Sequence, residues 1–146
     1  MDAGKSDRAI LIDTREQRPF LFDGAVRRTL RTGDYSIEGA EDLIAIERKS
    51  LSDLLGCIGQ GRNRFERELE RLGAMPYPAV VIEASLAEVL NGTRHTSIHP
   101  NSVLGSLCAW SIRYRLPLFF CGNRALAQLV TERLLMKAAK YAAGRS

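Results

Sequence analysis

Cysteine and histidine are scarce in this chain, and their scarcity excludes several classes of protein. The three cysteines, Cys57, Cys108 and Cys121, are odd in number and form no Cys-x-x-Cys pair. We therefore expect reduced, buried thiols, and neither a disulfide framework nor a zinc site. The two histidines, His95 and His99, stand four residues apart in a segment rich in Thr, Ser and Asn. That composition predicts a loop, which lacks the helical spacing of a zinc-binding pair.

Long apolar runs are also missing. No run reaches the length that crosses a membrane, and the first six residues lack the apolar core of a secretory signal. We therefore expect a cytoplasmic protein without a membrane partner, associated with the nucleoid if its source is prokaryotic or viral. The 146 residues suffice for one domain with a real core. We expect a flexible N-terminus over residues 1–7 and a single domain over residues 8–146.

Acidic residues are scarce in the second half of the chain. Residues 76–146 carry 8 Lys and Arg against 3 Asp and Glu, whereas residues 1–75 carry 13 against 14. The net charge of +4 suits a polyanionic partner, although a solvated basic face that binds nothing has the same composition. The acids therefore concentrate in the half that holds the candidate site.

The pattern of apolar residues predicts an α/β fold. Strands are expected over residues 9–12, 26–32, 35–37, 43–47, 77–83 and 116–121. Helices are expected over residues 51–55, 62–72, 86–90, 102–113 (or to 115) and 125–143. The second, third and fourth strands are expected to form a meander, and the glycine-rich residues 56–61 a loop. This order predicts a central mixed sheet flanked by helices on both sides, as in three-layer α/β folds.

One stretch of 20 residues contains carboxylates and a lysine that could form a catalytic site. Asp34 follows a glycine and precedes a tyrosine at the end of an expected strand, and Glu47 and Lys49 stand two apart on another. Side chains two apart on a strand leave the same face, whereas Arg48 points the other way. Carboxylates are hard ligands that suit Mg²⁺ or Mn²⁺, and a neighbouring lysine can orient a water and stabilise developing charge. A surface cluster of salt bridges would show the same short pattern.

The longer string resembles the nuclease motif of the XPF-type structure-specific endonucleases. The matching residues are 33–35 (Gly-Asp-Tyr), 47–50 (Glu-Arg-Lys-Ser) and Asp53. Residues 12–16 (Ile-Asp-Thr-Arg-Glu) are similar to that family's opening strand motif, and 61–62 (Gly-Arg) to its later arginine. The resemblance implies a restriction-endonuclease-like fold and metal-dependent cleavage of branched DNA, such as flaps, forks and junctions, during repair or recombination. It also implies a homodimer.

The resemblance assigns roles to individual residues. Asp34 and Glu47 would ligate Mg²⁺ or Mn²⁺, and Lys49 would position or activate the attacking water. Three further active-site residues are implied, which are Asp13, Arg48 and Asp53. Two DNA-contacting arginines are implied, Arg15 and Arg62, while Glu16 matches the family without a clear role. Arg64 is added as a DNA contact because it lies on the basic face of the expected helix, a face that solvent alone would also explain.

Other features leave alternatives open. Glu83 ends a buried strand, where it would either add an acid near the metal or meet an arginine. The last helix has a wider apolar surface than one sheet contact needs, which is compatible with subunit association. Family members usually carry helix-hairpin-helix modules after the nuclease domain. We expect a stand-alone domain here, with a fragment or a protein that works with a partner as the alternatives. The alternative functions are a non-catalytic DNA-binding or dimerisation subunit, and a restriction-type enzyme that reads sequence.

Overall fold

A computed structural model describes residues 8–144, and the flexible segment expected over residues 1–7 lies outside this range. Its six strands form one sheet in the order β2-β1-β3-β4-β5-β6. The strands are β1 (Ile10–Ile12), β2 (Val26–Arg27), β3 (Tyr35–Ile37), β4 (Ile44–Lys49), β5 (Tyr77–Ile82) and β6 (Leu118–Phe120). The helices are α1 (Leu51–Ile58), α2 (Arg62–Gly73), α3 (Leu86–Gly92), the 3₁₀ turn η1 (Thr93–His95), α4 (Pro100–Tyr114) and α5 (Arg124–Ala143).

The sheet is mixed, as expected. β3 runs antiparallel to both β1 and β4, whereas β4, β5 and β6 are parallel to one another. The end of β1, the start of β3 and the end of β4 therefore lie side by side at one end of the sheet. The acidic and basic side chains of the motif lie at this end.

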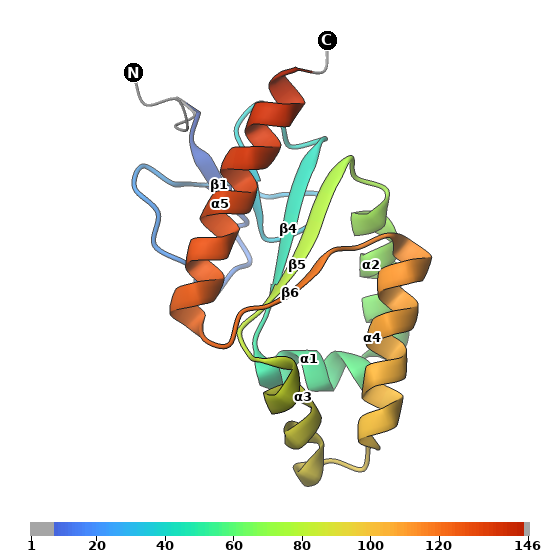
Figure 1. Ribbon diagram of the computed structural model, residues 1–146. Helices are drawn as coiled ribbons and strands as arrows, with labels where there is room; N and C mark the ends of the chain where they lie inside the picture. Colours follow the sequence, from blue (N-terminus) through green and yellow to red (C-terminus); the bar gives the residue numbers. More distant parts are fainter. Residues whose placement is uncertain (1–7, 145–146) are drawn as a thin grey trace.

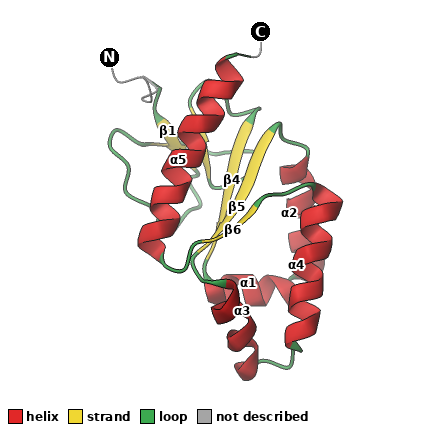
Figure 2. Ribbon diagram, viewed as in Figure 1, coloured by secondary structure: helices red, strands yellow, loops and turns green. Residues whose placement is uncertain are grey.

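Helices cover both faces of the sheet and give it two hydrophobic cores (Figures 1 and 2). On one face, α5 packs against β3, β4 and β5, where Tyr35, Ile46 and Leu135 are buried. On the other face, α1, α2 and α4 bury Leu54 and Phe65 among a second set of apolar side chains. The three-layer arrangement expected from the order of elements is therefore confirmed.

The strand expected over residues 26–32 is mostly wrong. Only Val26 and Arg27 form β2, and they pair parallel with β1 at the edge of the sheet, not with β3. The reason is a buried carboxylate: the Leu30 amide donates to Asp13 Oδ1 over 2.8 Å, and the Leu30 carbonyl accepts from Arg15 Nη2 over 2.8 Å. Backbone groups engaged by side chains are withdrawn from a strand ladder.

The first helix is longer than expected. The Asp53 amide donates to Ser50 Oγ over 3.2 Å, which confirms the predicted cap. The helix then continues through Gly56 to Ile58, where a glycine-rich loop was expected. A glycine in a helix costs less than about 1 kcal/mol relative to alanine, and the burial of Leu54 and Ile58 on α1 offsets it.

Two smaller expectations also need correction. α4 is capped by His99, whose Nδ1 accepts from the Asn101 amide over 3.0 Å, so the helix begins earlier than predicted, with a proline at its first position. All three cysteines are free, as expected, but Cys108 is exposed, and Cys57 and Cys121 are half-buried. Between residues 8 and 144, the structure contains no helix whose length and apolar character would let it span a membrane.

Candidate active site

The register between β3 and β4 brings two carboxyl groups together. Tyr35 pairs with Ile46, so the residues flanking them, Asp34 and Glu47, are cross-strand neighbours on one face of the sheet. The Asp34 amide donates to the Ile46 carbonyl over 2.8 Å, and the Arg48 amide donates to Asp34 Oδ2 over 2.8 Å. The charge of Asp34 acts on Glu47, as expected for two carboxyl groups at neighbouring positions. The predicted convergence of these acids is therefore present.

The glycine that precedes Asp34 is required by this arrangement. Gly33 has φ of +80°, a conformation that favours glycine strongly. A Cβ at this position would also lie 3.1 Å from the Ala45 side chain and 3.3 Å from the Ile46 amide nitrogen. The Gly-Asp pair thus lets the chain enter β3 directly against the backbone of β4.

Lys49 lies on β4, two residues after Glu47, and its side chain is close to the Glu47 carboxylate. Its Nζ lies 3.5 Å from Glu47 Oε1, and the two side chains are only 15% and 14% exposed. The ammonium also stands over the Phe65 ring, 5.1 Å from its centre, which holds the side chain in place. The prediction that Glu47 and Lys49 leave one face of β4 is confirmed.

Burial and mutual repulsion shift the acidity of this cluster. Burial raises the pKa of Asp34 to about 6, and the charge of Glu16 adds to the shift, while the bond from the Arg48 amide opposes it. Burial and the charge of Asp34 raise the pKa of Glu47 well above its usual value. Burial is the largest single influence and opposes the charge on Lys49, but the surrounding negative charges, led by Glu47, together outweigh it and raise the pKa of Lys49. The lysine therefore remains a cation.

Arg48 points to the opposite face of the sheet, as strand alternation predicts. Its Nε lies 2.6 Å from Glu83 Oε1 and its Nη1 3.1 Å from Glu16 Oε1, with the side chain only 9% exposed. Arg124 also reaches Glu83 Oε1, over 3.2 Å. Of the two readings of Glu83, the meeting with an arginine is therefore the one observed. Arg48 contributes to the site through its backbone amide, and a direct catalytic role for its side chain stays a prediction.

Asp13 and Arg15 form a second support beside the acids. Asp13 is 2% exposed, and its Oδ2 accepts from Arg15 Nε over 2.8 Å. Burial alone would raise the pKa of Asp13, but the bonds from Arg15 and the Leu30 amide outweigh it, and the pKa is lowered. The Arg15 side chain is 70% exposed and senses the charges of Asp34 and Glu47. It lies at the rim of the site, where a phosphate contact was predicted.

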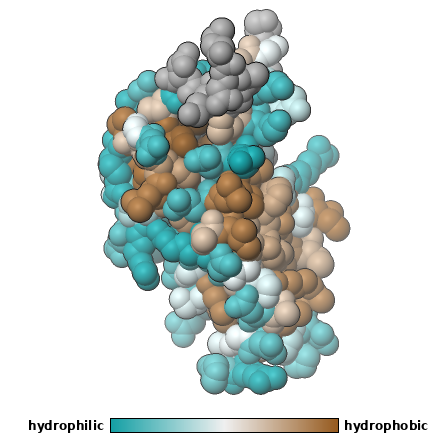
Figure 3. Space-filling model, turned by 60° about the vertical axis from the view of Figure 1, so that its left-hand side comes forward, coloured by the Kyte–Doolittle hydropathy of each residue, from teal (hydrophilic) through white to brown (hydrophobic). Residues whose placement is uncertain are grey.

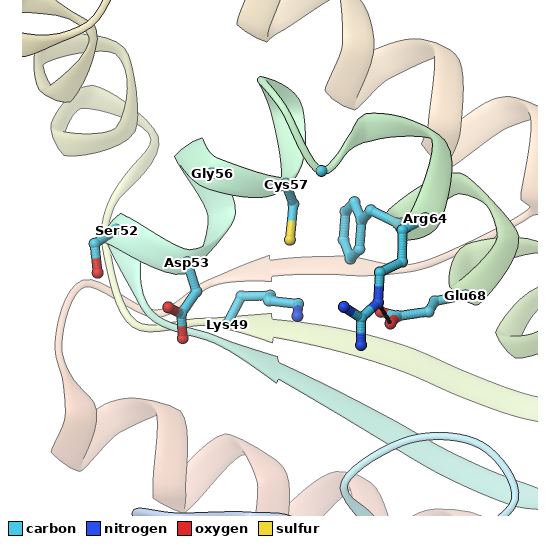
Figure 4. Close-up of a pocket in the computed structure, with 9 residues that line it drawn as sticks. Lys49, Ser52, Asp53, Gly56, Cys57, Arg64 and Glu68 are labelled. Atoms are coloured by element: carbon cyan, nitrogen blue, oxygen red, sulfur yellow. Dashed lines mark ion pairs between the residues drawn. The ribbon is translucent and has the colours of Figure 1, made fainter.

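A pocket of about 370 Å³ opens on the other side of Lys49, between α1 and α2 (Figure 4). Asp53 and Arg64, both predicted site residues, line it. The Arg64 side chain is 85% exposed and makes only a loose pair with Glu68, at 3.8 Å. Sequence reasoning missed Glu68, although its i, i+4 spacing from Arg64 is a signal that was present. Cys57 also lines the pocket and had no such signal.

Arg62 is placed differently from Arg64. Its Nη1 donates to Ser106 Oγ over 2.8 Å and its Nε pairs with Glu66 over 2.9 Å, while the guanidinium stacks 4.9 Å from the centre of the Trp110 ring. These contacts join α2 to α4. Arg62 does not line the pocket beside Lys49, and its contact with DNA stays a prediction.

The donor set suits a hard divalent ion. Asp34 and Glu47 present two carboxyl groups against the single cation of Lys49, so a dication would offset an excess of negative charge. Within residues 8–144, no three His, Cys, Asp or Glu side chains are grouped to hold a metal. An ion bound by two carboxylates would keep waters and take oxygens from a phosphate, as Mg²⁺ commonly does.

Two solved structures have a fold similar to that of this chain. Its fold is similar to that of XPF from Aeropyrum pernix, with a TM-score of 0.72, 20% sequence identity, and coverage of 89% of this chain and 61% of that one. A second structure, XPF from Aeropyrum pernix in complex with DNA, gives a TM-score of 0.66 at 20% identity and covers 91% of this chain and 66% of that one.

The chain therefore spans less than two thirds of the length of these structures. No functionally curated protein matches its sequence. The likeness confirms the expected α/β class and the restriction-endonuclease-like, XPF-type architecture. A family model described as the ERCC4 domain matches residues 12–134, so this protein belongs to the ERCC4 domain family.

Proposed function

We propose that this protein is a divalent-metal-dependent endonuclease that hydrolyses phosphodiester bonds in DNA. The observation that carries the proposal is the convergence of Asp34, Glu47 and Lys49 at one end of the sheet, with the two acids at cross-strand positions and the lysine Nζ 3.5 Å from Glu47 Oε1. Two hard ligands can hold a metal ion that activates a water, and a fixed cation beside them can stabilise charge on the phosphate. Membership of the ERCC4 domain family supports the same reading.

Asp34 and Glu47 would hold Mg²⁺ or Mn²⁺, which when bound lowers the pKa of a water and neutralises charge on the phosphate. The protein's own side chains orient the water and bind the phosphates. Lys49 is fixed between Glu47 and the Phe65 ring, and its raised pKa keeps it charged. It therefore acts as a cation that orients the attacking water and stabilises the developing charge, and it is poorly suited to accept a proton. Arg15, at the rim, would hold a neighbouring phosphate.

The substrate we propose is branched DNA, such as a flap, a fork or a junction, cut during repair or recombination inside the cell. The support is the XPF-type motif and the similar structure of XPF from Aeropyrum pernix in complex with DNA. Two exposed arginines, Arg15 near the acids and Arg64 in the pocket beside Lys49, suit contacts with the phosphates of a DNA strand.

We further propose that the protein works as a homodimer. The long helix α5 exposes Leu126 at 48%, Leu129 at 47% and Tyr141 at 61%, and Figure 3 shows apolar side chains gathered on one face of the molecule. Leu126 and Leu129 are three residues apart and share one side of the helix. Leu129→Glu should convert a dimer to a monomer in light scattering, whereas Leu86→Glu on α3 should not. A wild-type monomer at micromolar concentration would contradict this proposal.

A non-catalytic DNA-binding or dimerisation subunit is the alternative. It shares the fold and the arginines but has no need for Asp34 and Glu47, whose shared burial is costly without a metal. A restriction-type enzyme that reads sequence remains the third reading. Cleavage and its substrate preference separate the three.

The decisive experiment measures cleavage of labelled flap, fork, single-stranded and plain duplex DNA with Mg²⁺, Mn²⁺ or EDTA. We expect the wild type to cut branched DNA only with a metal. Lys49→Ala and Glu47→Gln should abolish cleavage while leaving the fold intact by circular dichroism. Lys140→Ala, which removes an exposed lysine from α5, is the matched control and should cut normally. Retained metal-dependent activity in Glu47→Gln would refute the assignment of the site, and binding without cleavage by the wild type would favour the non-catalytic subunit.

A further inference from the structure

The pocket between α1 and α2 has a composition that the cleavage reaction does not explain. Its walls carry two donors, Lys49 and Arg64, and two acceptors, Asp53 and Glu68. In Figure 4 the ammonium of Lys49 and the guanidinium of Arg64 approach each other, while Asp53 lies at the other end beside Ser52. Lys49 and Asp53 are predicted active-site residues, whereas the cleavage reaction assigns no role to Glu68, Gly56 or Cys57.

Charge and size together restrict what this pocket can bind. A free phosphate would meet Lys49 and Arg64 but also the carboxylates of Asp53 and Glu68, so the walls are nearly neutral in sum. A volume of about 370 Å³ is at the small end of ligand pockets, large enough for a single nucleoside and too small for a stacked base pair. Mixed donors and acceptors around a neutral occupant are what a nucleobase requires.

We propose that this pocket binds the unpaired nucleotide next to the bond that is cleaved. Its base lies between the Arg64 guanidinium and the wall formed by Gly56 and Cys57, and its phosphate faces Lys49. The carboxylate of Asp53 or of Glu68 accepts from the exocyclic amino group of the base. The inference rests on the proposed nuclease function and adds to it a physical basis for structure selectivity: a base held in a duplex must first unpair and unstack, and one beside a flap or fork need not.

Gly56 offers a direct way to fill the pocket. It lines the pocket on α1, and a Cβ built on it meets nothing within 4 Å. A Gly56→Leu side chain would therefore occupy the space of the base without a backbone clash, and leucine favours the helix over glycine. Gly105 on α4 provides the matched control, because its Cβ also meets nothing within 4 Å and it does not line the pocket.

The experiment compares wild type, Gly56→Leu and Gly105→Leu with single-stranded, flap and duplex DNA in EDTA. The strands carry 2-aminopurine, whose fluorescence rises when the base leaves its stack. We expect the wild type and Gly105→Leu to show this rise on unpaired DNA. Gly56→Leu should lose it and bind unpaired DNA about tenfold more weakly, the effect of one well-held base, with duplex affinity unchanged.

A second pair of variants guards against a folding defect in Gly56→Leu. Arg64→Ala removes the guanidinium from the pocket wall, whereas Arg67→Ala removes an exposed arginine of α2 outside the pocket. Only Arg64→Ala should reduce the fluorescence rise. If Gly56→Leu and Arg64→Ala bind and unstack unpaired DNA as their controls do, the pocket proposal is refuted, even when all variants cleave. A protein that unstacks the base in the wild type but cleaves no DNA with Mg²⁺ or Mn²⁺ upholds the pocket and refutes the nuclease.

Discussion

Replacing Asp34 with asparagine should stabilise the fold while it destroys the proposed metal site. Asp34 faces Glu47 across β3 and β4, and burial with little compensating charge raises its pKa from 3.8 to about 6. The folded protein therefore binds the Asp34 proton more tightly than the unfolded chain does. An asparagine keeps the acceptor for the Arg48 amide, and it adds an amide donor that Glu47 can accept from.

The size and the pH window follow from the pKa shift. Because the pKa is raised on folding, wild-type stability falls as the pH rises from 3.8 through about 6 and stays low above that. A shift of this size corresponds to at most about 3 kcal/mol, since each pKa unit contributes about 1.4 kcal/mol. Asp34→Asn should therefore gain between about 1 and 3 kcal/mol over the wild type near pH 8, and nothing below about pH 4.

Urea unfolding in EDTA, followed by the fluorescence of Trp110, measures this difference. The free energy of unfolding is obtained for both proteins at several values of pH. Asp42→Asn is the matched control, because it removes one carboxylate from an exposed position in the turn before β4 and should change stability little at any pH. Adding Mg²⁺ should raise the stability of the wild type and leave that of Asp34→Asn unchanged.

One result would refute this reasoning outright. If Asp34→Asn is less stable than the wild type near pH 8 in EDTA, the carboxylate is stabilised by the folded protein and the two acids do not oppose each other. The same variant should bind DNA at least as tightly as the wild type in EDTA, since a charge that repels phosphate is gone. Loss of DNA binding there would instead make Asp34 a structural residue.

Two further changes test the supports of the site. Arg48→Met should destabilise the protein by about 3 kcal/mol in urea unfolding, because it leaves the buried carboxylates of Glu16 and Glu83 with one cation fewer; a loss below about 1 kcal/mol would mean that the network is not needed. Gly73→Ala should cost about 1–3 kcal/mol, because its Cβ would lie 2.5 Å from the Tyr114 carbonyl oxygen where α2 meets the end of α4; an unchanged melting temperature would show that the two helices can separate there.

The sequence predicts the site better than it predicts the sheet around it. Glu47 and Lys49 share a face because strand alternation is a local rule, and the Ser50 cap is equally local. The expected strand over residues 26–32 failed because the Leu30 backbone binds the side chains of Asp13 and Arg15, up to seventeen residues away. No periodicity within the segment encodes such a contact.

The placement of Arg62 and Arg64 also could not be predicted from the sequence. Arg62 and Arg64 stand two apart at the start of α2, and the sequence treats both as DNA contacts. In the fold, Arg62 is fastened to Ser106 and Trp110 of α4, whereas Arg64 is left 85% exposed beside the pocket. Which of two neighbouring arginines faces the site depends on where α4 packs. The packing of α4 on α2 is a tertiary contact, and the spacing of residues within α2 does not predict it.

Strand β4 explains why the triplet Glu47, Arg48 and Lys49 works as a unit although its members face opposite ways. Glu47 and Lys49 face the site together with Asp34. Burial and repulsion raise the pKa values of Asp34 and Glu47 there, which opposes folding. Arg48 lies between Glu16 and Glu83 on the other face, and its amide holds the Asp34 carboxylate. The ion pairs beneath the sheet thus fix the backbone that keeps two repelling carboxylates together. A substitution of Arg48 should therefore weaken metal affinity through the position of Asp34, even though its guanidinium points away from the metal.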